Sequence, residues 1–464
     1  MRYRIEKDDL GELHVPAEAY YGIHTLRSKQ NFEISKRPIS RQMIKALALV
    51  KKAAAKANYD AGLIDKKVSE AICLACDEIL NGRLHGQFVT DLIQGGAGTS
   101  MNMNANEVIA NRANEMMGSE KGIYDRVHPI NHVNLCQSAN DVVPTAGKMA
   151  TFRLTKKLLT ELKKLSNAFY DKQNEFEDIL TVGKTHLLDS VPMTYGQLFG
   201  ALGNTVDRDI KRIEQTMTQL LEVNLGGTVI GTGLNAQEVY QKKVVKYIAT
   251  LSGEAFYPSK CLIDTTRNLD SFKMMSSAIL TLALNINKMA NDFKILSALF
   301  QQLELPTVQP GSSISPGKIN PVISEMVSQV VLYMQGNDLT ISLAVGSGEL
   351  ELNVNLPIIL ACLFENINFI RRAVRAMRES MVEGIKVVDD KEAVSKRIAQ
   401  LITPFVPVLG YVACQDIAKS AQHKKKSIVD VIVEEGYLTR DEVDSYLDKE
   451  KLIHPGWINQ EKKG

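Results

Sequence analysis

The sequence DSFKMMSSAILTLALNINKMANDFKILSALF, residues 270–300, indicates the fold class more clearly than any other stretch. Its apolar side chains surround a helix instead of lining one face, and they are Ile279, Leu280, Leu282, Leu284, Ile286, Met289, Phe293, Ile295 and Leu296. A helix that is apolar on all sides must be buried on all sides. Roughly thirty residues span about 45 Å at 1.5 Å per residue, which is long for the interior of one mid-sized domain.

Other long segments have the same character. An apolar stripe at positions 154, 158, 162, 165 and 169 predicts a helix within 146–180. Further long helices are predicted at about 193–223, 322–345 and 357–380, the last beginning at Pro357. The sequence therefore predicts a mainly all-α fold with a central bundle of long helices. We expect other subunits to extend this bundle; the alternative is a bundle within a monomer.

The 464 residues are enough for one very large domain or for two to three ordinary ones. Residues 1–140 mix short extended pieces, turns and helices, residues 141–390 contain the long helices, and residues 391–464 contain shorter ones. Pro404 and Pro407 interrupt the last region, where Thr439 and Glu442 have the spacing of a capping box. These three regions are the predicted domains.

The charge balance argues against several classes of partner. Fifty-five basic and 53 acidic residues give a net charge of +2, so neither nucleic acid nor an anionic membrane is an expected partner. The start, MRYRIEKDDLGELHVP, has no apolar signal region, and no run of 18 apolar residues predicts a membrane span. The cytoplasm is the default location that follows.

Nothing in the sequence indicates a metal or another cofactor. The eight histidines form no HExxH pattern. Cys73 and Cys76 form a CxxC, but they lie in a predicted helix without a second CxxC or a nearby histidine. We interpret both as small buried apolar residues.

Four segments are rich in glycine and small polar residues, and each lies near the edge of a predicted long helix. They are GGAGTSMNMNANE (95–107), HVNLCQSAND (132–141), GKTHLLDSVP (183–192) and GSSISPGKINP (311–321). In the last, the glycines and prolines exclude helix and strand. Lys318, Asn320 and backbone N–H groups suit a carboxylate, and a serine among such donors can act as a base. The alternative is a surface loop.

Two other features have competing interpretations. His186 lies among small polar residues in GKTHL, and a lone histidine is more often structural than catalytic. The run NLGGTVIGTGLN (224–235) is rich in glycine but lacks the GK[ST] of a phosphate loop, so a connection between helices is favoured over a nucleotide site.

Taken together, these segments resemble the aspartase/fumarase superfamily. Its signature GSSxMPxKxN is matched by Gly311, Ser312, Ser313, Pro316, Lys318 and Asn320. The resemblance covers nearly the whole chain in order. The segments AYYGIHTLRSKQNF (19–32) and GSGELELNVNLP (346–357) are more similar to the aspartases than to the fumarases.

The resemblance implies a three-domain helical fold in a homotetramer whose active sites each draw on three subunits. It also implies reversible deamination of L-aspartate to fumarate and ammonia. Ser312 matches the base that removes the Cβ proton, on a loop that closes over substrate. Thr99, Ser138 and Ser313 match residues that hold the β-carboxylate, and Lys318, Asn320 and Thr185 match those that hold the α-carboxylate. Asn140 and His186 match residues around the amino group, and Glu325 matches the acid that orients the histidine.

Three positions depart from the family pattern: Ala139 replaces a hydroxyl residue, Leu188 a glutamine and Ser315 a methionine. Loss of one donor to the β-carboxylate typically slows such a reaction roughly 100- to 1,000-fold. A related lyase with another β-substituent or leaving group, including fumarate hydratase, is therefore the alternative. Two further classes are a non-catalytic helical scaffold, which has no need of Ser312, His186, Lys318 and Asn320, and a nucleotide binder.

Overall fold

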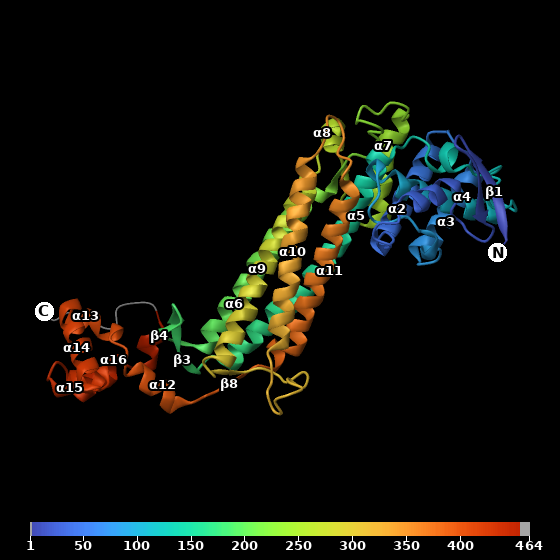
Figure 1. Ribbon diagram of the computed structural model, residues 1–464. Helices are drawn as coiled ribbons and strands as arrows, with labels where there is room; N and C mark the ends of the chain where they lie inside the picture. Colours follow the sequence, from blue (N-terminus) through green and yellow to red (C-terminus); the bar gives the residue numbers. More distant parts are fainter. Residues whose placement is uncertain (1, 455–464) are drawn as a thin grey trace. The chain divides into compact units, whose positions relative to one another are not determined.

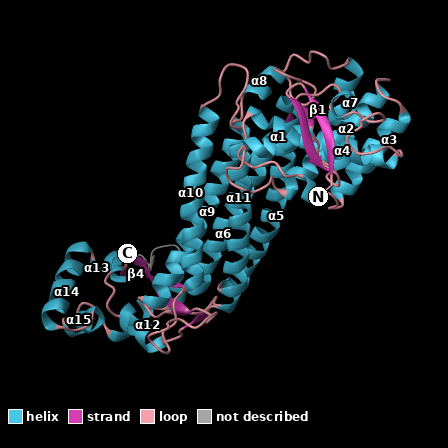
Figure 2. Ribbon diagram, turned by 45° about the vertical axis from the view of Figure 1, so that its right-hand side comes forward, coloured by secondary structure: helices cyan, strands magenta, loops and turns pink. Residues whose placement is uncertain are grey.

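The structure is a computed structural model that describes residues 2–454, and it is mainly helical (Figures 1 and 2). Its five long helices are α5 (Ala139–Glu175), α6 (Tyr195–Met217), α9 (Asp270–Ala298), α10 (Val322–Gly346) and α11 (Leu356–Ser380). These confirm the long helices predicted from the sequence, with small shifts. The first begins at residue 139 and carries Pro144 inside, and Pro357 is the second residue of α11 instead of the first.

The chain divides into two compact units. One comprises residues 1–161, 209–286 and 328–373, and the other comprises residues 162–208, 287–327 and 374–464. The division into three domains at about residues 140 and 390 remains a prediction.

The first unit contains the N-terminal helices and one part of each long helix. The other part of each long helix belongs to the second unit. Its other elements are β1 (Tyr3–Asp8), β2 (Gly11–Pro16), α1 (Ile23–Asn31), α2 (Arg41–Asp60), α3 (Lys66–Leu80), α4 (Thr99–Met116), β5 (Glu222–Val223), α7 (Glu238–Ser252), β6 (Tyr257–Pro258) and α8 (Leu262–Arg267). Strands β1 and β2 pair antiparallel, and the two-residue strands β5 and β6 pair parallel. Cys73 and Cys76 lie on α3, as predicted, and both are free thiols; Cys76 is buried as predicted, but Cys73 is only half-buried.

Close packing joins the long helices inside this unit. Gly147 on α5 has no room for a side chain, because a Cβ there would lie 2.8 Å from Leu360 on α11 and 3.4 Å from Phe272 on α9. Lys273 on α9 forms an ion pair with Asp338 on α10 at 2.7 Å. Within one chain, α9 is nevertheless not buried on all sides as its sequence predicts: Leu284 is 44% exposed.

The second unit has an aromatic core and a helical C-terminal part. Phe169, Phe199 and Phe293, from α5, α6 and α9, pack with ring centroids 5.8–6.4 Å apart. Its other elements are β3 (Leu180–Thr185), β4 (Leu188–Thr194), β7 (Leu303–Glu304), β8 (Lys386–Val387), α12 (Lys391–Ile398), α13 (Val406–Leu409), α14 (Tyr411–Lys424), α15 (Ile428–Glu434), α16 (Arg440–Tyr446) and α17 (Lys449–Ile453). Strands β3 and β4 pair antiparallel, as do β7 and β8.

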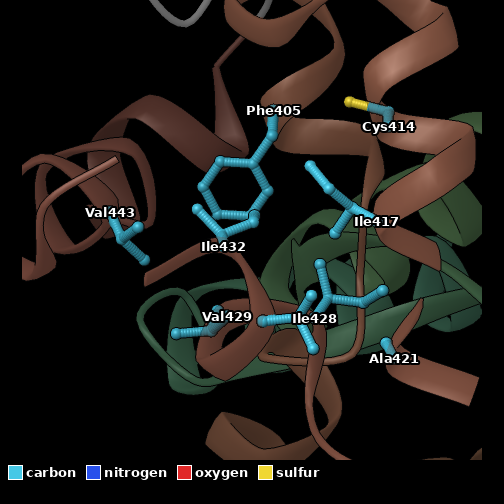
Figure 3. Close-up of a cluster of buried hydrophobic side chains, with 9 residues drawn as sticks. Phe405, Cys414, Ile417, Ala421, Ile428, Val429, Ile432 and Val443 are labelled. Atoms are coloured by element: carbon cyan, nitrogen blue, oxygen red, sulfur yellow. The ribbon is translucent and has the colours of Figure 1, made fainter. Parts of the chain in front are cut away.

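The short helices α14 to α16 share a small apolar core. Phe405, Ile417, Ile432 and Val443 are each fully buried in it, and Figure 3 shows their side chains converging. The capping box predicted at the start of α16 is confirmed: Glu442 N–H donates to Thr439 Oγ1, and Thr439 N–H donates to the Glu442 carboxylate at 2.8 Å. None of the described helices combines the length and the apolar content that a membrane crossing requires.

Candidate active site

The start of α5 carries two predicted binding residues, Ser138 and Asn140. The Asn140 N–H donates to Ser138 Oγ at 3.2 Å, and the Ser138 N–H donates to Asp141 Oδ1 at 3.0 Å. Together these two bonds cap the first turn of the helix. The N-terminus of a long helix is favourable for a carboxylate, because its N–H groups and dipole attract negative charge.

Thr99 is the first residue of α4, and the structure brings it beside the start of α5. The preceding residue, Gly98, has φ +90°, and a Cβ there would lie 2.8 Å from Val143 Cγ1 on α5. Only glycine permits both this backbone conformation and this close approach. Two helix N-termini therefore lie together in the first unit, with Thr99, Ser138 and Asn140 among their first residues.

The segment before Ser138 is held by a buried lysine that the sequence reasoning missed. Lys51 on α2 is fully buried and donates to Asn134 Oδ1 and to Gln137 Oε1, both at 2.9 Å. Asn102 and Asn106 on α4 also donate to Asn134 Oδ1, each at 3.1 Å. Burial lowers the pKa of Lys51 to about 7.

Asp141 is a second buried charge that the sequence reasoning missed. Its carboxylate is fully buried and accepts hydrogen bonds from the N–H groups of Ser138, Gly226 and Thr228, each at 3.0 Å. Burial raises its pKa to about 6, although the three N–H donors and the charge of Lys51 oppose that rise. Residues 224–235 form a connection, as predicted, but they follow the two-residue strand β5 instead of a helix and lead to α7; they also bind the start of α5.

His186 lies at the tip of the β3–β4 hairpin in the second unit. Thr185 pairs with Leu188, so His186 and Leu187 form a two-residue turn, and both have positive φ, +52° and +63°. Such a turn normally takes Asn-Gly, because other residues are strained in this conformation. Backbone strain of this kind is concentrated at functional sites. His186 is exposed and lines a cavity of about 430 Å³ with Lys184 and other residues.

The hairpin is braced by a network of charged side chains around Asp189. Arg397 donates to both carboxylate oxygens of Asp189 at 2.7 and 2.8 Å, and Lys184 donates to it at 2.6 Å. Hydrogen bonds from Arg397, followed by those from Lys184, lower the pKa of Asp189 to about 2. The bidentate pair fixes β4 next to the turn that presents Thr185 and His186.

The loop 311–320 folds back on itself. Asn320 Nδ2 donates to the Gly311 carbonyl at 2.6 Å, and a Cβ on Gly311 would lie only 1.7 Å from the Lys318 carbonyl oxygen. Ser312 Oγ accepts from the N–H groups of Ser315 at 2.8 Å and Ile314 at 3.2 Å. Two N–H donors aimed at one hydroxyl oxygen stabilise negative charge on it, which is what a serine base requires.

The remaining predicted residues of this region are exposed. Ser313 and Lys318 lie on the same loop as Ser312, and Glu325 lies in the first turn of α10. Within the described residues of one chain, no hydrogen bond or ion pair joins Glu325 to His186. The candidate residues therefore form three groups: two helix starts, one hairpin tip and one loop.

Of the three departures from the family pattern, only Ala139 is buried. It is the first residue of α5 and is 8% exposed, and its methyl group supplies no donor. Leu188 is 71% exposed at the start of β4, and Ser315 is exposed on the loop. Their effect on substrate choice remains a prediction.

Comparison with protein families identifies two matching regions. Residues 11–336 match the model of a family described as lyase, and residues 401–454 match that of the fumarase C C-terminus. The chain is 43% identical to the aspartate ammonia-lyase of Bacillus subtilis, over 99% of this chain and 98% of that protein. It is 41% identical to the aspartate ammonia-lyase of Escherichia coli, over 98% of this chain and 97% of that protein.

Solved structures show the same fold. A fumarate lyase/delta crystallin from Brucella melitensis, crystallised with cobalt, superimposes with a TM-score of 0.94 at 39% identity, covering 98% of this chain and all of that chain (100%). The class II fumarase of Schistosoma mansoni superimposes with a TM-score of 0.92 at 31% identity, covering 96% of this chain and 98% of that chain.

Proposed function

The chain belongs to the aspartase/fumarase lyase family, and from that premise we propose that it converts L-aspartate reversibly to fumarate and ammonia. The observation that carries the proposal is the loop 311–320. It places a serine oxygen under two N–H donors, on the same short segment as Lys318 and Asn320. A base beside donors for a carboxylate is the combination that this reaction needs.

The chemistry explains why donors matter as much as the base. The Cβ proton of aspartate is weakly acidic, and its removal places a second negative charge on the adjacent β-carboxylate. The resulting aci-carboxylate forms only if positioned donors stabilise it more strongly than they stabilise the ground state. Ser312 takes the proton, the C–N bond then breaks, and the nitrogen leaves already protonated, so a strong general acid is not required.

The other candidate residues divide among the parts of the substrate. Thr99, Ser138 and Ser313 are proposed to bind the β-carboxylate, Thr185, Lys318 and Asn320 the α-carboxylate, and Asn140 and His186 the amino group, with Glu325 orienting His186. The helix starts that carry Ser138 and Thr99 support the first assignment, because the positive end of a helix dipole favours the site of developing negative charge.

We also propose that the enzyme is a homotetramer with shared active sites. An exposed stripe runs along one face of α10 and includes Leu332, Leu339 and Leu343, which are 60–66% exposed in a single chain. Apolar residues at helical spacing on a long helix are typical of a surface that other helices cover. The cytoplasm remains the predicted location.

A direct assay tests the proposed reaction. Purified enzyme is incubated with L-aspartate, and fumarate is followed by its ultraviolet absorbance. We expect fumarate release, and we expect Ser312→Ala to lower kcat by about 100- to 10,000-fold, the usual contribution of a general base. Ser347→Ala, which removes an exposed serine hydroxyl elsewhere, is the control and should retain activity.

The same assay distinguishes the alternative function. If well-folded tetramer releases no fumarate from L-aspartate, the proposal is wrong, and malate and other α-amino acids become the substrates to screen. The observation that favours this alternative is Ala139, whose buried methyl group lies in the first turn of α5 between Ser138 and Asn140.

A further inference from the structure

Asn140 is held in one orientation by three hydrogen bonds. Its N–H donates to Ser138 Oγ, its side-chain Nδ2 donates to the Val229 carbonyl at 2.7 Å, and its own carbonyl accepts from Asn224 Nδ2 at 3.0 Å. The bond from Nδ2 to Val229 fixes the orientation of the amide, and the amide oxygen, which accepts no hydrogen bond from the described residues, is available to a ligand. A fixed acceptor suits an ammonium group, which can only donate.

The third of these contacts exists because of Pro144. In a regular helix the N–H of residue 144 would donate to the carbonyl of residue 140, but proline has no N–H. The Asn140 carbonyl is therefore free for Asn224. Asn224 is itself buried and fixed by a second hydrogen bond, from its Nδ2 to Thr266 Oγ1 at 3.0 Å.

Asp141 sets the position of the loop that holds Asn140. One carboxylate oxygen accepts from the N–H groups of Gly226 and Thr228, which stand on the loop just before Val229. The other oxygen accepts from the N–H of Ser138. A single buried carboxylate thus ties the loop and the first turn of α5 to each other.

Thr228 shows that this loop geometry is maintained at an energetic cost. It has φ +56°, a conformation that β-branched residues rarely adopt, and it is 3% exposed. Its hydroxyl is buried and has no hydrogen-bond partner among the described residues. Strain and an unpaired polar group persist only where the surroundings enforce them, and here the enforcing contact is the carboxylate of Asp141.

We propose that Asp141 is a positioning residue: through residues 226–229 it fixes Asn140 as the acceptor for the substrate's amino group. This inference rests on the proposed function. Asp141 touches no substrate in this account and acts only through Asn140. A purely structural role, in which Asp141 only caps α5, would instead affect the KM values of both substrates alike.

The positioning role and the purely structural role can be distinguished in the reverse reaction, the addition of ammonia to fumarate. In that direction the concentrations of ammonia and fumarate are varied independently. In Asp141→Asn one oxygen becomes an NH2 donor facing an N–H donor, so the side chain can no longer tie the loop and the first turn of α5 to each other. We expect KM for ammonia, supplied as ammonium chloride, to rise about 10-fold or more while KM for fumarate stays within about twofold, since loss of a hydrogen bond to a charged group typically weakens binding by at least that factor.

Glu107→Gln is the matched control. Glu107 is also a buried carboxylate that accepts backbone N–H groups at a helix start, those of Gly22, His24 and Thr25. We expect this variant to lose thermal stability without a selective rise in KM for ammonia. An equal rise in both KM values for Asp141→Asn, as for a general structural defect, would overturn the inference.

A double-mutant cycle provides the decisive measurement. If Asp141 acts through Asn140, Asp141→Asn should raise KM for ammonia no further in an Asn140→Ala background. A full additional rise there would also overturn the inference. If Asp141→Asn does not fold, Asn224→Ser, which removes the other tether of Asn140, replaces it in the same cycle. Wild-type enzyme that forms no aspartate would overturn the proposed function itself, and active wild type with an unselective variant would overturn only this inference.

Discussion

The segment 134–141 and the segment 311–320 both carry candidate active-site residues, but they are stabilised in opposite ways. The first is tied to the rest of the first unit by Lys51, Asn102, Asn106 and the 224–229 loop. The contacts that hold the second are internal, from Asn320 to Gly311 and from Ser312 to the N–H groups that follow it.

Because of this difference, substitutions in the two segments should affect different properties, the folding free energy in one case and turnover in the other. A segment held by buried polar groups cannot lose one of them without leaving partners unsatisfied in a dry interior. An exposed loop with internal contacts can be altered at little cost to the folding free energy. Substitutions in 134–141 should therefore change stability first, and substitutions in 311–320 should change turnover first.

The largest effect should come from Asn134→Ala. Three buried donors, on Lys51, Asn102 and Asn106, would lose their shared acceptor, and each unsatisfied group costs about 1–3 kcal/mol. We expect the free energy of unfolding to fall by about 3–5 kcal/mol in urea titrations. Asn131→Ala, which shortens an exposed asparagine nearby, should change it by less than about 0.5 kcal/mol. Equal effects of the two variants would contradict the comparison.

In the loop 311–320, Lys318→Met should lower turnover and leave stability unchanged, the opposite of the effect expected for Asn134→Ala. Removing the charge proposed to hold the α-carboxylate should lower kcat/KM for L-aspartate by about 10- to 100-fold, because hydrogen bonds to charged groups contribute about 1.5–3 kcal/mol. The unfolding midpoint should not change, since Lys318 is exposed. Lys386→Met, at another exposed lysine, is the control for charge. A lower midpoint with normal turnover would reverse our assignment.

Gly311→Ala tests whether turnover depends on the folded-back conformation of the loop 311–320. The new Cβ would lie 1.7 Å from the Lys318 carbonyl, so the loop must open to accommodate it. We expect kcat to fall about 10-fold, roughly 1.4 kcal/mol, with no change in the unfolding midpoint. Gly86→Ala is the control, because a Cβ at Gly86 meets nothing within 4 Å. Unchanged turnover in Gly311→Ala would show that the loop works without this closure.

The smallest effect, taken per pH unit, concerns the pH dependence of stability. Lys51 has a pKa of about 7 in the folded protein, below its ordinary value of 10.5, so the unfolded chain binds more protons between these values. The unfolding free energy of wild type, relative to Lys51→Met, should therefore rise from pH 8 to pH 10 by about 1 kcal/mol per pH unit, with about 1.36 kcal/mol per pH unit as the upper limit for one proton. Urea titrations at one protein concentration measure this. Lys52→Met, whose partner is Asp77, should keep the wild-type slope, and parallel profiles for wild type and Lys51→Met would exclude the shift.

Much of the fold was predictable because its signals are local. The apolar periodicity of residues 270–300 and the capping pair Thr439 and Glu442 each depend on residues a few positions apart. The helix start at residue 139 was harder, because Pro144 suggests a break. The proline is tolerated there because Asn224, 80 residues later in the sequence, satisfies the carbonyl that it leaves unpaired.

The site was predictable only in part, for the same reason. Ser312, Lys318 and Asn320 stand within one motif, so the pattern could be recognised. Lys51 and Asp141 look ordinary in the sequence, since a lysine on an amphipathic helix is normally exposed. Only the tertiary structure shows that both are buried around residues 134–141. The 224–235 segment was correctly predicted to be a connection. Its hydrogen bonds to Asn140, from Asn224 and to the Val229 carbonyl, join residues far apart in the sequence, so no local pattern predicts them.

The internal hydrogen bonds of the 311–320 loop also have an evolutionary consequence. A segment held by internal hydrogen bonds can accept new side chains at little cost to the folding free energy. Mutations in this loop can therefore change the chemistry of the site while the protein stays folded. Ser315, exposed beside the backbone N–H that supports Ser312, stands at such a position. Residue 139, buried in the first turn of α5, has no such freedom. If the substrate changes during evolution of this protein, we therefore expect substitutions in the loop 311–320 to precede substitutions at residue 139.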